Sequence, residues 1–85
     1  MQYRRIETAT DVAKTNELLD LQGEWSNFIV LHNDVDFEYQ INSETTDVLY
    51  SKEIQGFEGD EGRFRKLFVS HSALAGGKIV VLVYN

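Results

Sequence analysis

Alternation of apolar and polar side chains with period two is the clearest pattern in this sequence. In the segment 37–41, three apolar side chains alternate with Glu38 and Gln40, which predicts a strand with one face in a core and one in water. The segment 26–32 is rich in β-branched and aromatic residues and predicts another strand. Residues 33–36, which separate the two segments, have the composition of a hairpin turn.

Further apolar segments follow at close spacing, with turn-forming residues between them. They predict short strands at 48–50, 53–57, 67–71 and 78–84. The segment 78–84 is apolar on both faces, which is typical of a strand in the middle of a structure rather than at its rim. The double glycine that precedes this segment permits a tight turn with positive φ.

The N-terminal part of the chain allows alternative interpretations. The segment 2–7 alternates roughly and predicts either an edge strand or an ordered arm. Thr10 could cap a short helical turn near residues 11–19, because threonine is favoured at helix N-termini. The same stretch is short and contains weak helix formers, so a loop leading into a short strand at 17–21 is the alternative.

These elements predict a mainly β protein, an antiparallel β-sandwich or small barrel of about six to eight short strands. We expect residues 1–16 to form an N-terminal strand or arm, and residues 17–85 to form a single β-sandwich domain. A chain of 85 residues buries only about 60–65% of the surface that its unfolded form exposes. Its stability margin is therefore expected to be thin.

The composition limits how such a small domain is stabilised. Cysteine is absent, so the chain forms neither disulfides nor thiolate metal sites. The only histidines are His32 and His71, and the acidic turns around Asp34 and at 58–61 lack the ligand spacing of a calcium loop. We therefore expect no metal and no cofactor. A partner subunit is the remaining source of stability that suits this composition.

The net charge of −6 disfavours binding to duplex DNA or to a membrane surface, which both favour a cationic face. The basic segment 63–66 is a local exception, and Phe64 within it could stack on a base. We favour a solvated strand with protective charges there, and expect no nucleic-acid partner. The longest apolar runs are too short to span a bilayer, and residues 1–6 lack the apolar stretch of a secretory signal. We therefore expect synthesis in the cytoplasm and no membrane partner.

No catalytic motif is present in the sequence, and we do not expect an enzyme. Ser70 and His71 are adjacent on a predicted strand, so their side chains point to opposite faces and cannot act as a nucleophile and its base. His71 would share a face with Leu67 and Val69, which indicates a half-buried structural residue.

Five residues are candidates for binding a partner. Most aromatic side chains should be core, but Trp25, Phe57 and Phe64 lie at strand starts or beside a glycine-rich loop, where an aromatic residue can anchor a partner. The alternative is that they pin their own loops to the domain. Arg4 and Arg5 form the basic pair of the opening segment and could make charge-assisted bonds to carboxylates of a partner.

Four strand and turn segments carry a family resemblance: Phe28-Ile-Val-Leu-His-Asn, Phe37-Glu-Tyr-Gln-Ile-Asn, Leu67-Phe-Val-Ser-His-Ser and Gly76-Gly-Lys-Ile-Val-Val-Leu-Val. In these segments the chain resembles short all-β accessory proteins of tailed-virus particles. In such proteins a valine–serine–asparagine turn precedes an alanine- and glycine-containing loop and a last apolar strand. His71 stands where asparagine would be more usual. The resemblance covers the chain from Trp25 to its end.

The resemblance implies a structural role in a virion. The chain would be a decoration or cement protein on a capsid lattice, or a small tail or fibre component. It would be made in the host cytoplasm and then reside in the virion, with other viral structural proteins, and also copies of itself, as partners. The resemblance carries no functional residues over to this chain.

Two other functions remain as alternatives. The first is a small-ligand or carbohydrate-binding β module that uses Trp25 or Phe57 as a stacking platform. The second is a phage-encoded inhibitor of a host enzyme that mimics nucleic acid through its acidic surface. Such an inhibitor should display its carboxylates as a stripe, whereas here they are spread from Glu7 to Glu61.

Overall fold

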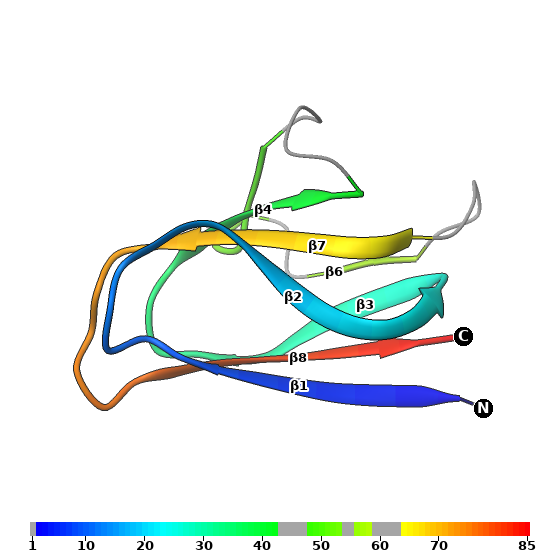
Figure 1. The fold of residues 1–85 in the computed structure, drawn as a ribbon, viewed down its shortest axis with the longest axis horizontal. Coiled ribbons are helices and arrows are strands. Elements are labelled where there is room, and N and C mark those ends of the chain that lie inside the picture. The colour runs from blue at the N-terminus through cyan, green and yellow to red at the C-terminus, as the bar shows by residue number, and fades with distance from the viewer. Residues whose placement is uncertain (1, 43–47, 54–55, 59–63) are drawn as a thin grey trace.

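The computed structural model describes residues 2–42, 48–53, 56–58 and 64–85, and for 56–58 it describes the backbone only. Within these ranges every regular element is a β-strand. The strands are β1 (Tyr3–Ala9), β2 (Lys14–Trp25), β3 (Asn27–Asn33), β4 (Phe37–Ile41), β5 (Leu49–Tyr50), β6 (Gly56–Glu58), β7 (Phe64–His71) and β8 (Lys78–Tyr84). They form two layers that pack face to face (Figure 1), so the predicted β-sandwich is confirmed.

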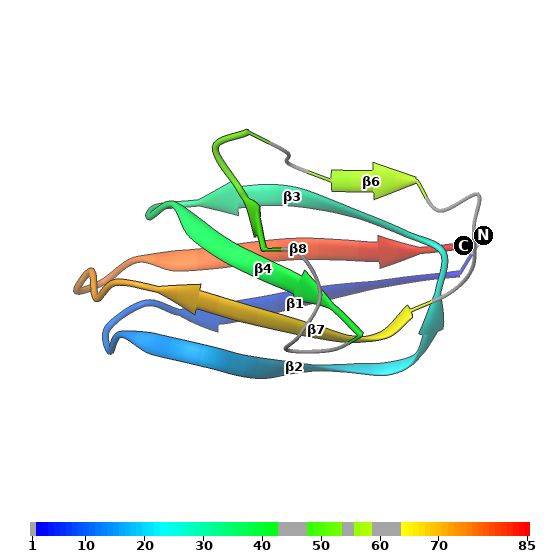
Figure 2. The same ribbon diagram turned by 90° about the horizontal axis from the view of Figure 1, so that it is seen from above.

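The strand order is that of a jelly roll. One sheet, which we call sheet I, has the order β1–β8–β3–β6, and the other, sheet II, has the order β2–β7–β4–β5. The first strand therefore pairs with the last, the second with the seventh, the third with the sixth and the fourth with the fifth, all antiparallel. The chain is thus a long hairpin rolled into two four-stranded sheets (Figure 2).

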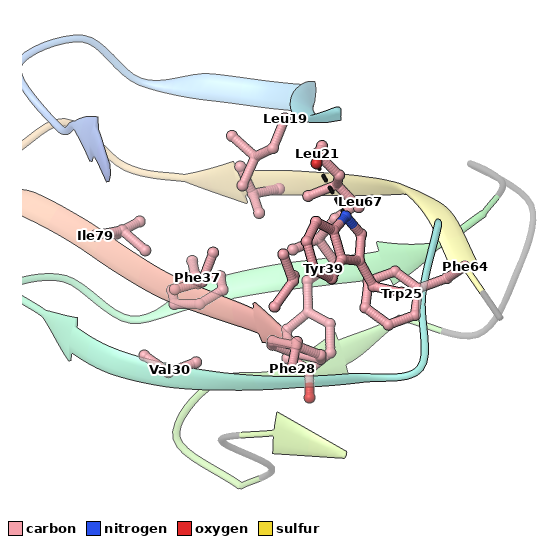
Figure 3. Close-up of a cluster of buried hydrophobic side chains, with 13 residues drawn as sticks. Leu19, Leu21, Trp25, Phe28, Val30, Phe37, Tyr39, Phe64, Leu67 and Ile79 are labelled. Carbon is pink, nitrogen blue, oxygen red and sulfur yellow. Dashed lines mark hydrogen bonds between the residues drawn. The ribbon is translucent and has the colours of Figure 1, made fainter. Parts of the chain in front are cut away.

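Aromatic side chains from both sheets form the centre of the core. The rings of Phe28 on β3 and Tyr39 on β4 meet edge to face, with centroids 5.0 Å apart and an interplanar angle of 83°. Phe64, at the start of β7, packs against Phe28 with centroids 6.3 Å apart (Figure 3). Such pairs contribute about 0.5–1.5 kcal/mol each beyond their buried area, and here they join the two layers.

Strand β8 is central, as its apolar pattern predicted. It lies between β1 and β3 in sheet I. Its inward side chains Ile79, Val81 and Val83 are at most 1% exposed. On the outer face Val80 is equally buried, whereas Leu82 is only half-buried. The strand therefore has one face in the core and one that is partly covered.

The opening segment of the chain is a strand of the sandwich. It pairs with β8 in regular antiparallel register, from Tyr3 opposite Tyr84 to Ala9 opposite Lys78. Of the two alternatives left by the sequence, the structure contains the edge strand and not the arm. The chain termini consequently lie side by side at one end of sheet I (Figures 1 and 2).

The helical turn considered near residues 11–19 is wrong, because most of this stretch lies in β2. Leu19 and Leu21 are buried on one face while Asp20 between them is exposed, and Leu19 pairs with Leu67 of β7. This is the period of a strand. Asn16 also has a φ of 51°, a left-handed conformation that interrupts any right-handed helix. Burial against β7 therefore outweighed the local capping signal.

The other predicted strands differ mainly at their ends. The predicted segments 37–41 and 78–84 match β4 and β8, and β7 extends upstream of the predicted segment to Phe64. The segment 53–57 is wrong at its start, because Glu53 lies in a turn in which its amide donates to the carbonyl of Tyr50 at 3.0 Å. The backbone of β6 begins only at the glycine of position 56, and residues 54–55 lie outside the described ranges.

A buried threonine ties together two loops at one end of the sandwich. The Thr10 hydroxyl donates to the carbonyl of Leu74 at 2.8 Å, and its amide donates to the carbonyl of Gly77 at 3.1 Å. A Cβ at position 77 would overlap the Thr10 hydroxyl, so glycine is required there for close approach. Gly76 has a φ of 75°, as expected of the double-glycine turn.

Candidate functional site

Strand β3 presents two apolar side chains to solvent on the outer face of sheet I. Ile29 is 42% exposed and Leu31 is 50% exposed, whereas their neighbours Phe28 and Val30 are buried. Ile29 lies opposite Leu82 of β8. A register irregularity just after Val30 accompanies the outward position of Leu31, as is usual at a β-bulge.

Two tyrosines extend this surface across the sheet. Tyr3 and Tyr84 lie opposite each other on β1 and β8, and Tyr3 is 67% exposed. The outward side chains of one surface, which we call the apolar patch, are Tyr3, Ile29, Leu31, Leu82 and Tyr84. Tyr3, Ile29 and Leu31 are exposed, and Leu82 and Tyr84 between them are partly buried. Outward apolar side chains that neighbour one another are characteristic of protein–protein interaction sites. The patch sits on a sheet whose central strand is held on both sides.

A charged border adjoins the apolar patch on β1. The Glu7 carboxylate lies 3.7 Å from the guanidinium of Arg5 and 3.4 Å from the ammonium of Lys78, and all three side chains are about half exposed. Exposed pairs of this kind contribute little to stability. They do place both signs of charge beside apolar side chains, as at the rim of a protein interface.

A second polar cluster fixes the turn between β3 and β4. The Asp34 carboxylate accepts hydrogen bonds from the backbone amide of Lys78 at 2.9 Å and from the ring of His32 at 2.8 Å. These two hydrogen bonds, that of the amide first, hold the pKa of the Asp34 carboxyl below its usual value of 3.8. The cluster connects the turn to the start of β8.

Two of the five predicted partner-binding residues are core residues instead. Trp25 is 8% exposed and its indole nitrogen donates to the carbonyl of Leu21 at 2.9 Å (Figure 3). Phe64 is 1% exposed and packs against Phe28. Neither side chain is available at the surface as an anchor. The side chain of Phe57, on β6, lies outside the described part of the structure.

The two arginines of the predicted set point in opposite directions from β1. Arg5 faces out on sheet I, with 52% of its side chain exposed. Arg4 faces inward with Ile6 and Thr8, along the open side of the sandwich next to β2. Its Nε is buried and has no hydrogen-bond partner among the described residues. The sequence places these charges next to each other, but the strand separates them onto two faces.

A polar groove of about 390 Å³ lies at one end of sheet II. Its walls include both signs of charge and an exposed ring, from residues such as Lys14, Glu38, Tyr50, Lys52 and Ser70. His71 also lines it, although it is only 7% exposed. Its Nδ1 donates to the backbone carbonyl of Ser72 at 2.8 Å, because a carbonyl only accepts.

The groups around His71 are not arranged for nucleophilic catalysis. His71 faces inward with Leu67 and Val69, as the sequence indicated. The Ser70 hydroxyl is instead bound to Asn16, whose backbone amide donates a hydrogen bond to it at 2.9 Å. No three potential metal ligands lie close together in the described part of the chain. The same ranges contain no helix long and apolar enough to cross a membrane.

Comparison with known proteins adds no relative to this picture. No family model matches the chain, and no curated protein or solved structure matches it.

The sequence reasoning missed most of the apolar patch. Ile29 and Leu31 belong to an apolar run that was predicted as a strand without an exposed face, and the outward side of that run is exposed in the structure. Because residues 28–31 are apolar at every position, the signal was available: a strand in a two-layer sandwich buries one face only. The exposed alternate positions of such a run are therefore candidates for an interface.

Proposed function

We propose that this chain is a non-enzymatic structural subunit of a viral particle, which attaches to a capsid or tail lattice through the outer face of sheet I. The observation that carries the proposal is the apolar patch on that face, in which Tyr3, Ile29 and Leu31 are the exposed side chains. An attachment protein needs a rigid surface that loses little entropy on binding. A patch mounted on β3 and the central strand β8 meets that need.

The patch and its border together have the composition of a protein interface. Apolar side chains occupy the middle, and Arg5, Glu7 and Lys78 supply charged groups beside them. Charged rims contribute orientation and specificity, whereas the desolvated centre contributes most of the binding energy. The tyrosines at the end of the patch, Tyr3 and Tyr84, belong to a residue type that is enriched at interface hot spots.

The fold supports the same proposal by analogy. Jelly rolls occur in viral capsid and lectin domains, among others, and the sequence resembles small all-β virion accessory proteins. A fold alone does not assign a function, so the weight rests on the exposed surface. A small domain with a thin core also gains stability when it is held in a lattice.

The polar groove of sheet II supports a second candidate, a carbohydrate-binding module. Of the two stacking platforms expected for such a module, Trp25 is buried. Tyr50, which is 42% exposed beside Glu38, offers an alternative platform with a hydrogen-bonding partner next to it. A soluble oligosaccharide that shifted the resonances of Tyr50 and Glu38 would favour this function over attachment through sheet I.

The test of the leading proposal is whether the protein is a constituent of assembled particles. We expect its gene to lie among capsid or tail genes, and mass spectrometry to detect the protein in gradient-purified particles of the virus that carries that gene. An Ile29→Ser/Leu31→Ser double variant should stay folded but be lost from the particles, because two of the three exposed apolar side chains of the patch are removed.

Leu18→Ser is the matched control for this experiment. Leu18 is 53% exposed on β2, in the other sheet, so its substitution removes a similar apolar side chain without touching the patch. We expect the control to attach normally. Absence of the wild-type protein from the purified particles would refute the proposal, and equal attachment of the double variant would refute the role of the patch.

A further inference from the structure

Strand β1 differs from the other three strands that end the two sheets. Within the described residues β5 and β6 are short, with two and three residues. Strand β2 is long, but register shifts interrupt it and Asn16 and Gln22 have positive φ. Strand β1 runs in unbroken register for seven residues. Short or bulged edges resist pairing with another chain, and a long regular edge invites it.

The backbone hydrogen bonds show which residues of β1 face the free side. The amide of Asn85 donates to the carbonyl of Gln2, and the amide of Thr10 donates to the carbonyl of Gly77. In an antiparallel pair, hydrogen-bonded positions alternate along the strand. The even-numbered residues of β1 therefore bond to β8. The backbone groups of Tyr3, Arg5, Glu7 and Ala9 point away from β8.

We infer that β1 pairs with β1 of a second copy of this chain, antiparallel and centred on Ile6. In this register Tyr3 lies opposite Ala9 of the other copy, and Arg5 lies opposite its Glu7. All four free-side residues are then paired across the two-fold axis. Arg5 and Glu7 meet as opposite charges twice, once on each side of the axis. The strand is thus complementary to itself in both hydrogen bonding and charge.

Two buried polar groups that lack hydrogen bonds fit the same arrangement. The Nε of Arg4 and the Oε2 of Glu17 are buried and have no hydrogen bond among the described residues. The other carboxylate oxygen of Glu17 accepts from the hydroxyl of Thr8 at 3.1 Å, and Oε2 has only the ammonium of Lys14 at 3.7 Å. Thr8 lies four residues from Arg4, or about 14 Å along the strand. The two charges therefore cannot meet within one chain.

The second copy brings these groups together. In the register centred on Ile6, Arg4 lies opposite Thr8 of the other copy, at a non-hydrogen-bonded position where facing side chains are closest. Its guanidinium then comes beside Glu17 of that copy, which Thr8 holds in place. An inward charge on an edge strand normally discourages pairing. In this dimer, the inward charge of Arg4 is paired with the Glu17 carboxylate of the other copy.

Charge reversal tests this pairing in solution. Sedimentation velocity of the wild-type chain should show a concentration-dependent monomer–dimer equilibrium. Arg5→Glu and Glu7→Arg should each raise the dimer dissociation constant by about tenfold or more, because two attractive pairs become repulsive. An equimolar mixture should dimerise again. The Arg5→Glu chain carries two carboxylates at these positions, the Glu7→Arg chain carries two guanidinium groups, and every facing pair is then opposite in charge.

Controls separate this effect from a general effect of charge or folding. Lys66→Glu replaces a cation with a carboxylate, as Arg5→Glu does, but on the exposed face of sheet II. It should leave dimerisation unchanged. Arg4→Met should weaken the dimer without lowering the melting temperature of the monomer, since it removes a buried donor that the monomer leaves unsatisfied. Arg5 and Glu7 also border the attachment face of sheet I, but this test measures dimerisation of the isolated chain and so does not depend on attachment.

Three results would overturn the inference. The first is a wild-type chain that stays monomeric at its highest soluble concentration. The second is a dimer that both single reversals leave intact, which would place the contact on another surface. The third is a mixture of the two reversed chains that dimerises no better than either alone.

Discussion

Tyr39 illustrates how much a single residue depends on the layers around it. It is 1% exposed, with its ring against Phe28 from the opposite sheet and Phe37 from its own strand. Burial raises the pKa of its hydroxyl from 10.0 to about 12, because the charged form would lose its hydration. The native state therefore keeps a proton that the unfolded chain releases near pH 10.

This pKa shift predicts a loss of stability in alkaline solution. Because the folded pKa is the higher one, the stabilisation is fully present below pH 10 and is lost as the pH rises toward 12. The free energy of unfolding, measured by urea titration, should fall between these pH values. In Tyr39→Phe, which cannot ionise, the fall should be smaller. An equal fall in both proteins would contradict the pKa assigned to Tyr39.

At the same scale, the exposure of aromatic residues was the least predictable property of the candidate site. Trp25 and Phe64 have the sequence context of surface anchors, at strand starts beside glycine-rich or basic residues. In the structure both are buried, and Trp25 satisfies its indole by donating to Leu21. A core aromatic and an interface aromatic are the same residue type. Which of the two a residue becomes depends on contacts between strands that are distant in sequence.

Among the elements, strands that have two neighbours were the easiest to predict. Strands β4 and β8 match their predicted bounds. Burial on one or both faces of a strand requires an alternating or continuous run of apolar residues, which is easily recognised in the sequence. Strand β2 was partly missed since it is a bulged edge strand, in which a register shift separates the inward residues Leu19 and Leu21 from Trp25. The order of the strands could not be predicted, because it rests on pairings between the two ends of the chain.

The two faces of β8 predict different responses to a carboxylate. Val81 is 1% exposed in the core, so Val81→Asp should lower the free energy of unfolding by at least about 3 kcal/mol and prevent folding. Leu82 is half-buried on the outer face, so Leu82→Asp should cost only about 1 kcal/mol.

Circular dichroism and urea unfolding of both variants provide the measurement. In the sequence both faces of this strand are apolar, whereas the structure distinguishes the two positions. Val80 faces outward on β8, as Leu82 does, and yet is 1% exposed. The outer face of this strand is therefore buried at one position and partly exposed at another. A folded Val81→Asp variant, or a Leu82→Asp variant as damaged as Val81→Asp, would contradict the assignment of the faces.

At the scale of the whole molecule, the jelly roll makes the first strand part of the core structure. Strand β1 closes one side of sheet I, and its pairing with β8 joins the two ends of the chain. Its inward residues Arg4, Ile6 and Thr8 border the interior, while Tyr3 and Arg5 contribute to the outer face. The apolar patch and the free edge both depend on this strand. Both features therefore require that β1 is paired with β8 in solution.

Residue-resolved amide exchange of the dilute, monomeric protein tests that state most directly. We predict alternation along β1: slow exchange at Arg4, Ile6 and Thr8, whose amides face β8, and fast exchange at Tyr3, Arg5 and Glu7, whose amides face solvent. Uniformly fast exchange from Tyr3 to Thr8 would show a detached arm. It would contradict both the closed jelly roll and the free edge derived from it.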